Sequence, residues 1–366
     1  MSIAPVFIAR TAGFLIGSLS PMSDLPRTIT TEEELESVLT EPSDALVKFI
    51  PRVRGPLVIL GAGGKMGPTL AILAKRAAEE AGHRLEVIAI SRFGDAEARR
   101  SLEARGVKTI GCDLLERSSF EALPDTENVI YLVGMKFGTA NDPASTWAMN
   151  TVVPARVAER YPRARIVALS TGNVYPLSRV ATGGSLESDP LTPVGEYGNS
   201  AVGRERVFEY FSRRNGTPIV MLRLFYAVEL RYGVLVDIAR KVFVGDPINL
   251  ASGHFNCIWQ GDANEMILRS FDLATSPIAT RNLCAAEISP TRKTALRFGD
   301  LLDREPKFIG AESETALLGN AQRICGELGR PGTGLDTMIQ LIADWVKRGG
   351  SSLGKPTHFE TRDGKY

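Results

Sequence analysis

Residues 57–67 read LVILGAGGKMG, and no other stretch of the chain is as informative about its fold. Four consecutive apolar residues open it, which is typical of a strand buried on both faces of a parallel sheet. Three glycines then stand in GxxGxxG spacing, at Gly61, Gly64 and Gly67. Apolar residues at helical spacing follow over residues 68–81. A strand, a glycine turn and a helix in this order predict the phosphate-binding turn of a dinucleotide-binding fold.

The glycines of this turn meet separate physical requirements. A tight turn needs a positive φ, a diphosphate needs a close approach to the backbone, and the helix must pack near the strand. The amino end of the helix then presents unpaired N–H groups to the phosphates. We therefore predict that a nicotinamide dinucleotide binds here, against Gly61, Gly63, Gly64, Lys65, Met66 and Gly67.

The β–α alternation continues beyond the first helix. Further strands are predicted at residues 86–90, 108–110, 129–133, 165–169 and 219–223, with helical stretches between them. This pattern predicts an α/β fold, a Rossmann-type doubly wound parallel sheet. We expect the NAD(P)-binding Rossmann domain at residues 55–226 and a smaller C-terminal substrate-binding lobe at 227–350, which returns in part to the sheet. Residues 1–54 are then an N-terminal extension, with a helix at 31–39, and residues 351–366 a tail, with a segment that folds back onto the domain as the alternative.

Composition narrows the functional classes. Lys plus Arg (43) nearly balances Asp plus Glu (42), without the basic excess of nucleic-acid or membrane-surface proteins. Four cysteines without a CxxC pattern and three scattered histidines predict no metal site. The apolar segment at residues 3–19 contains Arg10 and is short for a membrane span. Residues 1–21 are expected to be an untranslated or disordered leader, with a secretory signal as the alternative, and the expected location is the cytoplasm.

The end of the second strand bears on which dinucleotide binds. Ser91 and Arg92 stand where an NAD site usually has an acidic residue for the ribose 2′-hydroxyl. A guanidinium matches a 2′-phosphate with paired donors, so NADP is favoured over NAD. The alternative is that Arg92 is a solvated loop residue. Asp113 and Leu114 follow the third strand, where the Asp113 carboxylate could meet the adenine amino group.

The later motifs resemble the extended short-chain dehydrogenase/reductase superfamily, in its NAD-dependent epimerase/dehydratase group. The stretch YLVGMK at residues 131–136 is similar to the family's fourth strand and loop, and LSTGNVY at 169–175 to its SSxxVY segment. The stretch YGNS at 197–200 is similar to the family's YxxSK motif. The resemblance covers most of residues 57–345.

The resemblance implies a role for each matching residue. Gly134 would pass close to the cofactor, Lys136 would approach its phosphate or nicotinamide ribose, and Asn150 would lie near the active site. Thr171 matches the catalytic serine or threonine that hydrogen-bonds the reacting oxygen, and Tyr197 matches the catalytic tyrosine. Relatives also pair through the helices that carry the tyrosine motif, so the resemblance implies a homodimer.

One position departs from the family pattern. The motif's lysine should stand four residues after the tyrosine, and this chain has Ala201 there. A free tyrosine has a pKa of about 10, so a base that works near pH 7 needs a cation beside it. Arg204, on the same helical face as Tyr197, and Lys136, from another strand, are the two substitutes. We favour Lys136, because Arg204 is expected to point too far along the helix; the alternative for Lys136 is a loop lysine in water.

These residues predict hydride transfer on a sugar or nucleotide sugar, in which Thr171 orients the oxygen and Tyr197 moves its proton. Epimerase, dehydratase and reductase outcomes stay open, and the rival hypothesis is a non-catalytic NADP-binding sensor or scaffold that has lost the tyrosine–lysine pair. No nucleic-acid or membrane partner is expected. Candidates to line the substrate cleft are Asn173, Arg223, Arg231, Tyr232 and Trp259, with surface arginines and core aromatic residues as the alternative.

Overall fold

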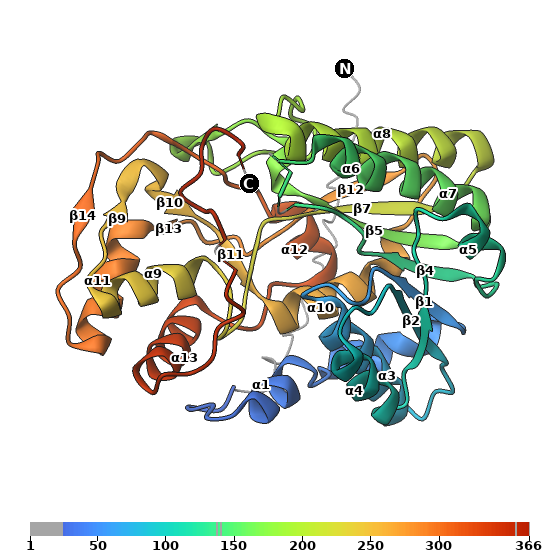
Figure 1. Ribbon diagram of the computed structural model, residues 1–366, viewed down its shortest axis with the longest axis horizontal. Coiled ribbons are helices and arrows are strands. Elements are labelled where there is room, and N and C mark those ends of the chain that lie inside the picture. The colour runs from blue at the N-terminus through green and yellow to red at the C-terminus, as the bar shows by residue number, and fades with distance from the viewer. Residues whose placement is uncertain (1–24, 137, 140, 356, 366) are drawn as a thin grey trace, which may run out of the picture.

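The computed structural model describes residues 25–136, 138–139, 141–355 and 357–365; the predicted leader at residues 1–21 lies outside them. A parallel sheet with helices on both faces forms the larger lobe, at the right of Figure 1, and a smaller lobe of helices and short strands lies beside it. This arrangement confirms the predicted Rossmann-type fold. In the described part of the chain, no helix is long and apolar enough to cross a bilayer.

The sheet has seven parallel strands in the order β12-β7-β5-β4-β1-β2-β3. Their bounds are β1 Leu57–Leu60, β2 Val87–Ser91, β3 Lys108–Gly111, β4 Asn128–Tyr131, β5 Arg165–Thr171, β7 Ile219–Leu224 and β12 Ala279–Leu283. The strand order reverses at β1, which pairs with β2 on one side and β4 on the other. Ligands of open α/β sheets bind outside the carboxyl ends of the strands at such a reversal.

The register brings three predicted segments to one edge of the sheet. Leu60 pairs with Ile90 of β2 and with Tyr131 of β4, so these three strands reach the same level at their carboxyl ends. The glycine turn that begins at Gly61, the end of β2 at Ser91 and the loop after β4 therefore meet there, although they are distant from one another in the chain.

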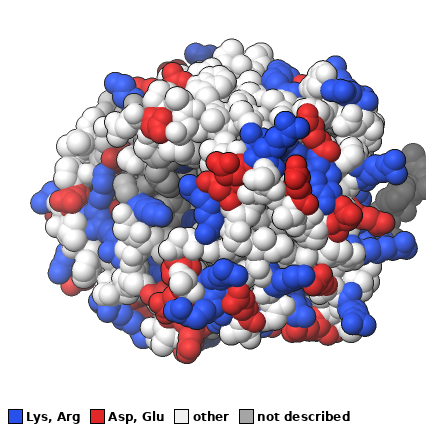
Figure 2. Space-filling model, turned by 45° about the vertical axis from the view of Figure 1, so that its right-hand side comes forward, with Lys and Arg blue, Asp and Glu red and all other residues white. Residues whose placement is uncertain are grey.

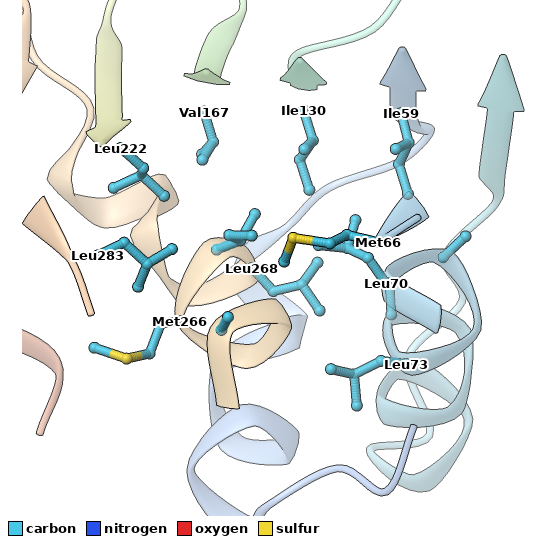
Figure 3. Close-up of a cluster of buried hydrophobic side chains, with 14 of the residues drawn as sticks. Ile59, Met66, Leu70, Leu73, Ile130, Val167, Leu222, Met266, Leu268 and Leu283 are labelled. Carbon is cyan, nitrogen blue, oxygen red and sulfur yellow. The ribbon is translucent and has the colours of Figure 1, made fainter. Parts of the chain in front are cut away.

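Alternate residues of the strands pack on opposite faces of the sheet. Figure 3 shows Ile59, Ile130, Val167 and Leu222 pointing toward Leu268 and other apolar side chains of the helices on one face. On the other face, Val58, Leu60 and their neighbours pack in a separate cluster with apolar residues of α7 and α8. The helix bounds are α2 Asp44–Phe49, α3 Gly67–Glu80, α4 Ala96–Ala104, α5 Arg117–Glu121, α6 Pro143–Trp147, α7 Val153–Arg160, α8 Gly195–Asn215, α10 Gln260–Arg269 and α12 Gln322–Leu328.

The smaller lobe has a core of its own. It is built by α9 (Val234–Val244), α11 (Thr291–Leu302) and α13 (Leu335–Lys347), and α1 (Glu32–Leu39) of the extension contributes Leu35 and Leu39. A capping box between Thr31 and Glu34 begins α1. The short strands are β6 Ser178–Arg179, β8 Tyr226–Val228, β9 Ile248–Asn249, β10 His254–Phe255, β11 Cys257–Trp259, β13 Ser289–Pro290, β14 Phe308–Ile309 and β15 Thr315–Ala316.

Charged side chains of both signs share the surface. Figure 2 shows Lys and Arg interspersed with Asp and Glu over the face that it presents. Many of these charges are paired, as in Arg99 with Glu103 at 3.0 Å and Arg292 with Glu312 at 2.8 Å. This mixture agrees with the nearly balanced composition of the chain.

Candidate active site

The glycine turn connects β1 to α3, and its shape depends on three glycines. Gly61 has φ +83°, and a Cβ there would lie 2.9 Å from the Val133 amide nitrogen. A Cβ on Gly67 would overlap the Ala62 carbonyl oxygen, and one on Gly63 would lie 2.5 Å from the Ser91 hydroxyl. Side chains at these positions would separate the turn from β2, β4 and its own helix.

The outer side of this turn fits a diphosphate. Gly64 and Gly67 donate their amides within the turn, to the carbonyls of Gly61 and Gly64. Within the described residues, the amides of Lys65 and Met66 have no hydrogen-bond acceptor at the amino end of α3. A helix amino end with unpaired amides attracts an anion. The turn therefore has the donors and the close backbone that a dinucleotide needs.

The residues predicted for the adenosine half lie at the same edge. Ser91 ends β2 beneath Gly63, and Arg92 follows it with an exposed side chain. Asp113 accepts a hydrogen bond from the Leu115 amide at 2.9 Å, and Leu114 is buried. The Arg92 side chain is thus accessible to a ligand, while Asp113 also serves its own turn.

Asn150 joins the loop after β4 to helix α8. It lies in a π-helical turn, Ala148–Val152, a form that often occurs at functional sites. Its side chain accepts from the Met135 amide at 3.3 Å and donates to the Ser200 hydroxyl at 2.9 Å. Ser200 in turn donates to the Tyr197 carbonyl at 3.0 Å. The side chain of Asn150 thereby fixes the loop after β4 relative to the helix that carries Tyr197.

Arg204 turns back toward the site, contrary to the expectation that it points too far along α8. Its guanidinium donates to the Leu169 carbonyl at 3.0 Å and to the Asn150 side-chain oxygen at 2.5 Å. A Cβ on Gly134 would lie 2.7 Å from one of its nitrogens. Arg204 is 4% exposed, and Ala201 is fully buried in an apolar cluster. The cation of this helix face therefore stands one turn beyond the family's lysine position.

Thr171 and Tyr197 come from adjoining segments. Thr171 ends β5, and its hydroxyl accepts from the Asn173 amide at 3.2 Å. Tyr197 lies in the first turn of α8, which packs closely on the turn after β5, since a Cβ on Gly198 would lie 2.7 Å from the Asn173 carbonyl oxygen. Both side chains are 8% exposed. The two predicted catalytic groups thus share one region of the sheet's carboxyl edge.

Lys65 extends from the glycine turn into the same region. It donates to the Ala227 carbonyl at 2.9 Å, and its ammonium lies 4.0 Å from the ring centre of Tyr232. Burial lowers the pKa of Lys65 to about 7, and the charge of Lys136 contributes to the lowering. Burial also raises the pKa of Tyr232, and Tyr197 raises it further. These four side chains therefore lie within electrostatic reach of one another.

Lys136 approaches from the loop after β4. It donates to the Thr357 carbonyl at 3.2 Å. Burial lowers the pKa of Lys136 to about 8, and the carboxylate of Asp237 opposes that shift. Lys136 is thus a half-buried cation that contacts the other lobe, and not the solvated loop lysine of the alternative hypothesis.

We expect Lys65→Met to weaken NAD⁺ binding about tenfold at pH 6, the loss of one charge-assisted contact. Lys65 is charged below pH 7 and loses its proton as the pH rises through about 7. Wild-type affinity should therefore fall more steeply than the variant's affinity between pH 6 and pH 8, as titration calorimetry would measure. Lys75→Met, on the outer part of α3, is the matched control. Parallel pH profiles for wild type and Lys65→Met would contradict a role for this ammonium.

Arg223, one of the substrate candidates, is engaged within the protein. Every nitrogen of its guanidinium donates to a protein acceptor, namely the Glu205 carboxylate at 2.7 Å, the Tyr175 hydroxyl and the Glu187 carbonyl. Its side chain is also buried. These contacts favour a structural role for Arg223. The alternative of a surface arginine is wrong for this residue, because its side chain is buried.

Of the other candidates for the substrate cleft, two have structural roles and two lie at the site. Arg231 pairs with carboxylates of Glu229 and Glu32, which favours a structural role. Trp259 is 1% exposed in the core of the smaller lobe, which corresponds to the core-aromatic alternative. Tyr232 lies under Lys65, and Asn173 lies beside Thr171, so both remain at the site.

Sequence reasoning missed two contributors, Asp237 and Thr357. Asp237 comes from α9, and Thr357 from the C-terminal segment, for which the sequence leaves a tail and a folded-back segment open. No local motif marks either residue, because each acquires its place through contacts with distant segments. No group of three His, Cys, Asp or Glu residues suited to a metal occurs among the described residues.

Comparisons with known proteins give a family match over part of the chain and several similar folds. Residues 57–229 match the model of the NAD dependent epimerase/dehydratase family. A putative epimerase from Burkholderia cenocepacia J2315 is 16% identical, with TM-score 0.66, over 81% of this chain and 99% of that one. UDP-glucuronic acid 4-epimerase from Bacillus cereus, solved with NAD, is 15% identical, with TM-score 0.66, over 82% and 99%. UDP-glucose 4-epimerase from Thermus thermophilus, also with NAD, is 18% identical, with TM-score 0.61, over 81% and 99%. No curated protein matches the chain.

Proposed function

We propose that this chain, whose residues 57–229 match the NAD-dependent epimerase/dehydratase family, is an extended short-chain dehydrogenase/reductase that transfers a hydride at a hydroxyl or ketone carbon of a sugar or nucleotide sugar. The observation that carries the proposal is the placement of Thr171 and Tyr197 at the same sheet edge as the glycine turn. The names of the similar solved structures, which include UDP-sugar 4-epimerases with NAD, support the substrate class.

Each residue has a distinct task in this proposal. A bound nicotinamide dinucleotide supplies the hydride acceptor or donor. The Thr171 hydroxyl holds the reacting oxygen, and the Tyr197 hydroxyl takes or returns its proton. Lys136 provides positive charge near Tyr197, while Arg204 and Asn150 hold the β4 loop against α8. Return of the hydride to the same substrate gives epimerisation or dehydration, and exchange of the dinucleotide with solution gives a dehydrogenase or reductase.

Calorimetry with NAD⁺ and NADP⁺ tests the first step. We propose that NADP⁺ binds more tightly, because the exposed Arg92 can pair with its 2′-phosphate. Arg92→Ala should weaken NADP⁺ binding about tenfold and leave NAD⁺ binding nearly unchanged. Arg84→Ala, just before β2, is the control. Equal effects on both dinucleotides would remove Arg92 from the 2′-phosphate site, and no uptake of either would contradict the proposed function.

Substrates are then sought among nucleotide sugars and free sugar acids, with products identified by NMR.

The second candidate function, a non-catalytic NADP-binding sensor or scaffold, is favoured by one observation: Ala201 is fully buried where the family has its lysine. Tight dinucleotide binding without turnover of any of these compounds would favour that candidate.

We also propose that the protein is a cytoplasmic homodimer that pairs through the face of α6 and α8. Exposed large side chains of α6, of the π-helical turn after it and of α8 support the pairing, namely Trp147, Val152 and Tyr210. Light scattering should give about twice the chain mass of 39.7 kDa, and a monomer mass would contradict the pairing.

A further inference from the structure

The C-terminal segment, residues 357–365, packs on the smaller lobe. Phe359 is buried in the core of that lobe, and Glu360 pairs with Lys241 of α9 at 2.6 Å. Arg362 donates to the carbonyls of Ala251 at 2.7 Å and Thr315 at 2.8 Å. In Figure 1 the end of the chain runs from α13 back to the centre of the molecule. These contacts make the segment an ordered part of the fold, which corresponds to the folded-back alternative and not to a tail.

Two contacts join this segment to the larger lobe. The Thr357 carbonyl accepts the hydrogen bond from Lys136. Near the end of the segment, Gly364 packs so closely on the backbone of Val194 and Gly195 that a Cβ on it would overlap the Val194 carbonyl oxygen. Gly195 begins α8, two residues before Tyr197. The segment therefore touches both the lysine and the tyrosine helix of the candidate site.

Thr357 is itself held by Asp237 of α9. The carboxylate accepts from the Thr357 amide at 2.9 Å and from its hydroxyl at 2.5 Å. Lys136 then donates to the carbonyl of the same residue. A continuous set of hydrogen bonds thus leads from the smaller lobe to Lys136.

We propose that Thr357 and Asp237 are positioning residues for Lys136, so that the C-terminal segment completes the active site. The inference rests on the proposed function. A lysine side chain is long and flexible, so its charge needs an acceptor at a fixed place to stay at the candidate site. Small displacements of a reacting group have large effects on rate, up to about 10²-fold for 1 Å.

Thr357→Val tests the proposal, because it removes the hydroxyl that holds the segment on Asp237. We expect kcat to fall about tenfold or more, KM to change much less, and dinucleotide uptake to persist. Thr357→Ser should restore kcat. Thr294→Val, which removes a buried hydroxyl from α11 of the same lobe, is the matched control and should keep wild-type kcat. Wild-type kcat in both Thr357→Val and Asp237→Asn would overturn the proposal.

A second measurement does not depend on turnover. The rate of reductive methylation of Lys136, followed by peptide mass mapping, should rise in Thr357→Val, while that of the exposed Lys347 stays constant. An unchanged rate at Lys136 would also overturn the proposal.

A second variant covers the case in which Thr357→Val does not fold. Gly364→Ala should then displace the segment from Val194 and lower kcat in the same way. Wild-type kcat in Gly364→Ala would overturn the proposal. Failure of the wild type to bind a dinucleotide would instead contradict the proposed function, and the methylation comparison would still report on Lys136.

Discussion

Tyr197→Phe is expected to lower kcat about 10³-fold, because positioned proton transfer contributes roughly 10²–10⁴-fold to enzymatic rates. The substitution removes one hydroxyl from a side chain that is 8% exposed and keeps its ring in place. The fold and dinucleotide affinity should therefore stay close to those of the wild type. Single-turnover measurements with the substrate found in the screen, together with calorimetry, separate the two effects.

Tyr210→Phe is the matched control for this prediction. Tyr210 lies on the same helix, α8, but its side chain is 57% exposed. Its substitution should leave kcat unchanged. If Tyr197→Phe retains wild-type kcat, Tyr197 does not transfer the proton, and another group must be sought among those that face the site.

The sheet can be predicted from sequence because its signals are local. Buried strands such as Leu57–Leu60 are short apolar runs, and the glycine turn that follows has a spacing imposed by its own backbone. The predicted strand at residues 129–133 is β4 at Asn128–Tyr131, because pairing with β1 ends at Tyr131 while the apolar pattern continues. The position of a buried strand can thus be predicted from its apolar residues, whereas the residue at which it ends depends on its pairing with the neighbouring strand.

The contacts of the candidate site are less predictable, because they join residues distant in sequence. Arg223 has the chemistry of a phosphate ligand, but the structure surrounds it with Glu205, Tyr175 and the Glu187 carbonyl. The helical position of Arg204 suggests a side chain that points away, yet its contact with Asn150 brings it back. A motif identifies which side chains are available, and only the packing shows which of them are already used.

The two substitutes for the family's lysine have different environments, and this decides between them. Arg204 donates to two acceptors inside the protein and is almost fully buried. Its removal would take one donor from the Asn150 side-chain oxygen and one from the Leu169 carbonyl, which costs stability as well as activity. Lys136 instead donates to a carbonyl on the opposite lobe, so its removal should affect the rate more than the fold.

Lys136→Ala is accordingly expected to abolish measurable turnover while the protein remains folded. Without the ammonium, the proton on Tyr197 has no neighbouring charge from the β4 loop to favour its transfer. Circular dichroism should show a wild-type melting temperature, and Lys136→Arg should recover part of kcat by restoring the charge. Lys307→Ala, in the smaller lobe, is the control. Unchanged activity in Lys136→Ala would remove this lysine from the mechanism and leave Arg204 as the cation that replaces the missing one, because no other charged side chain of α8 contacts Asn150 among the described residues.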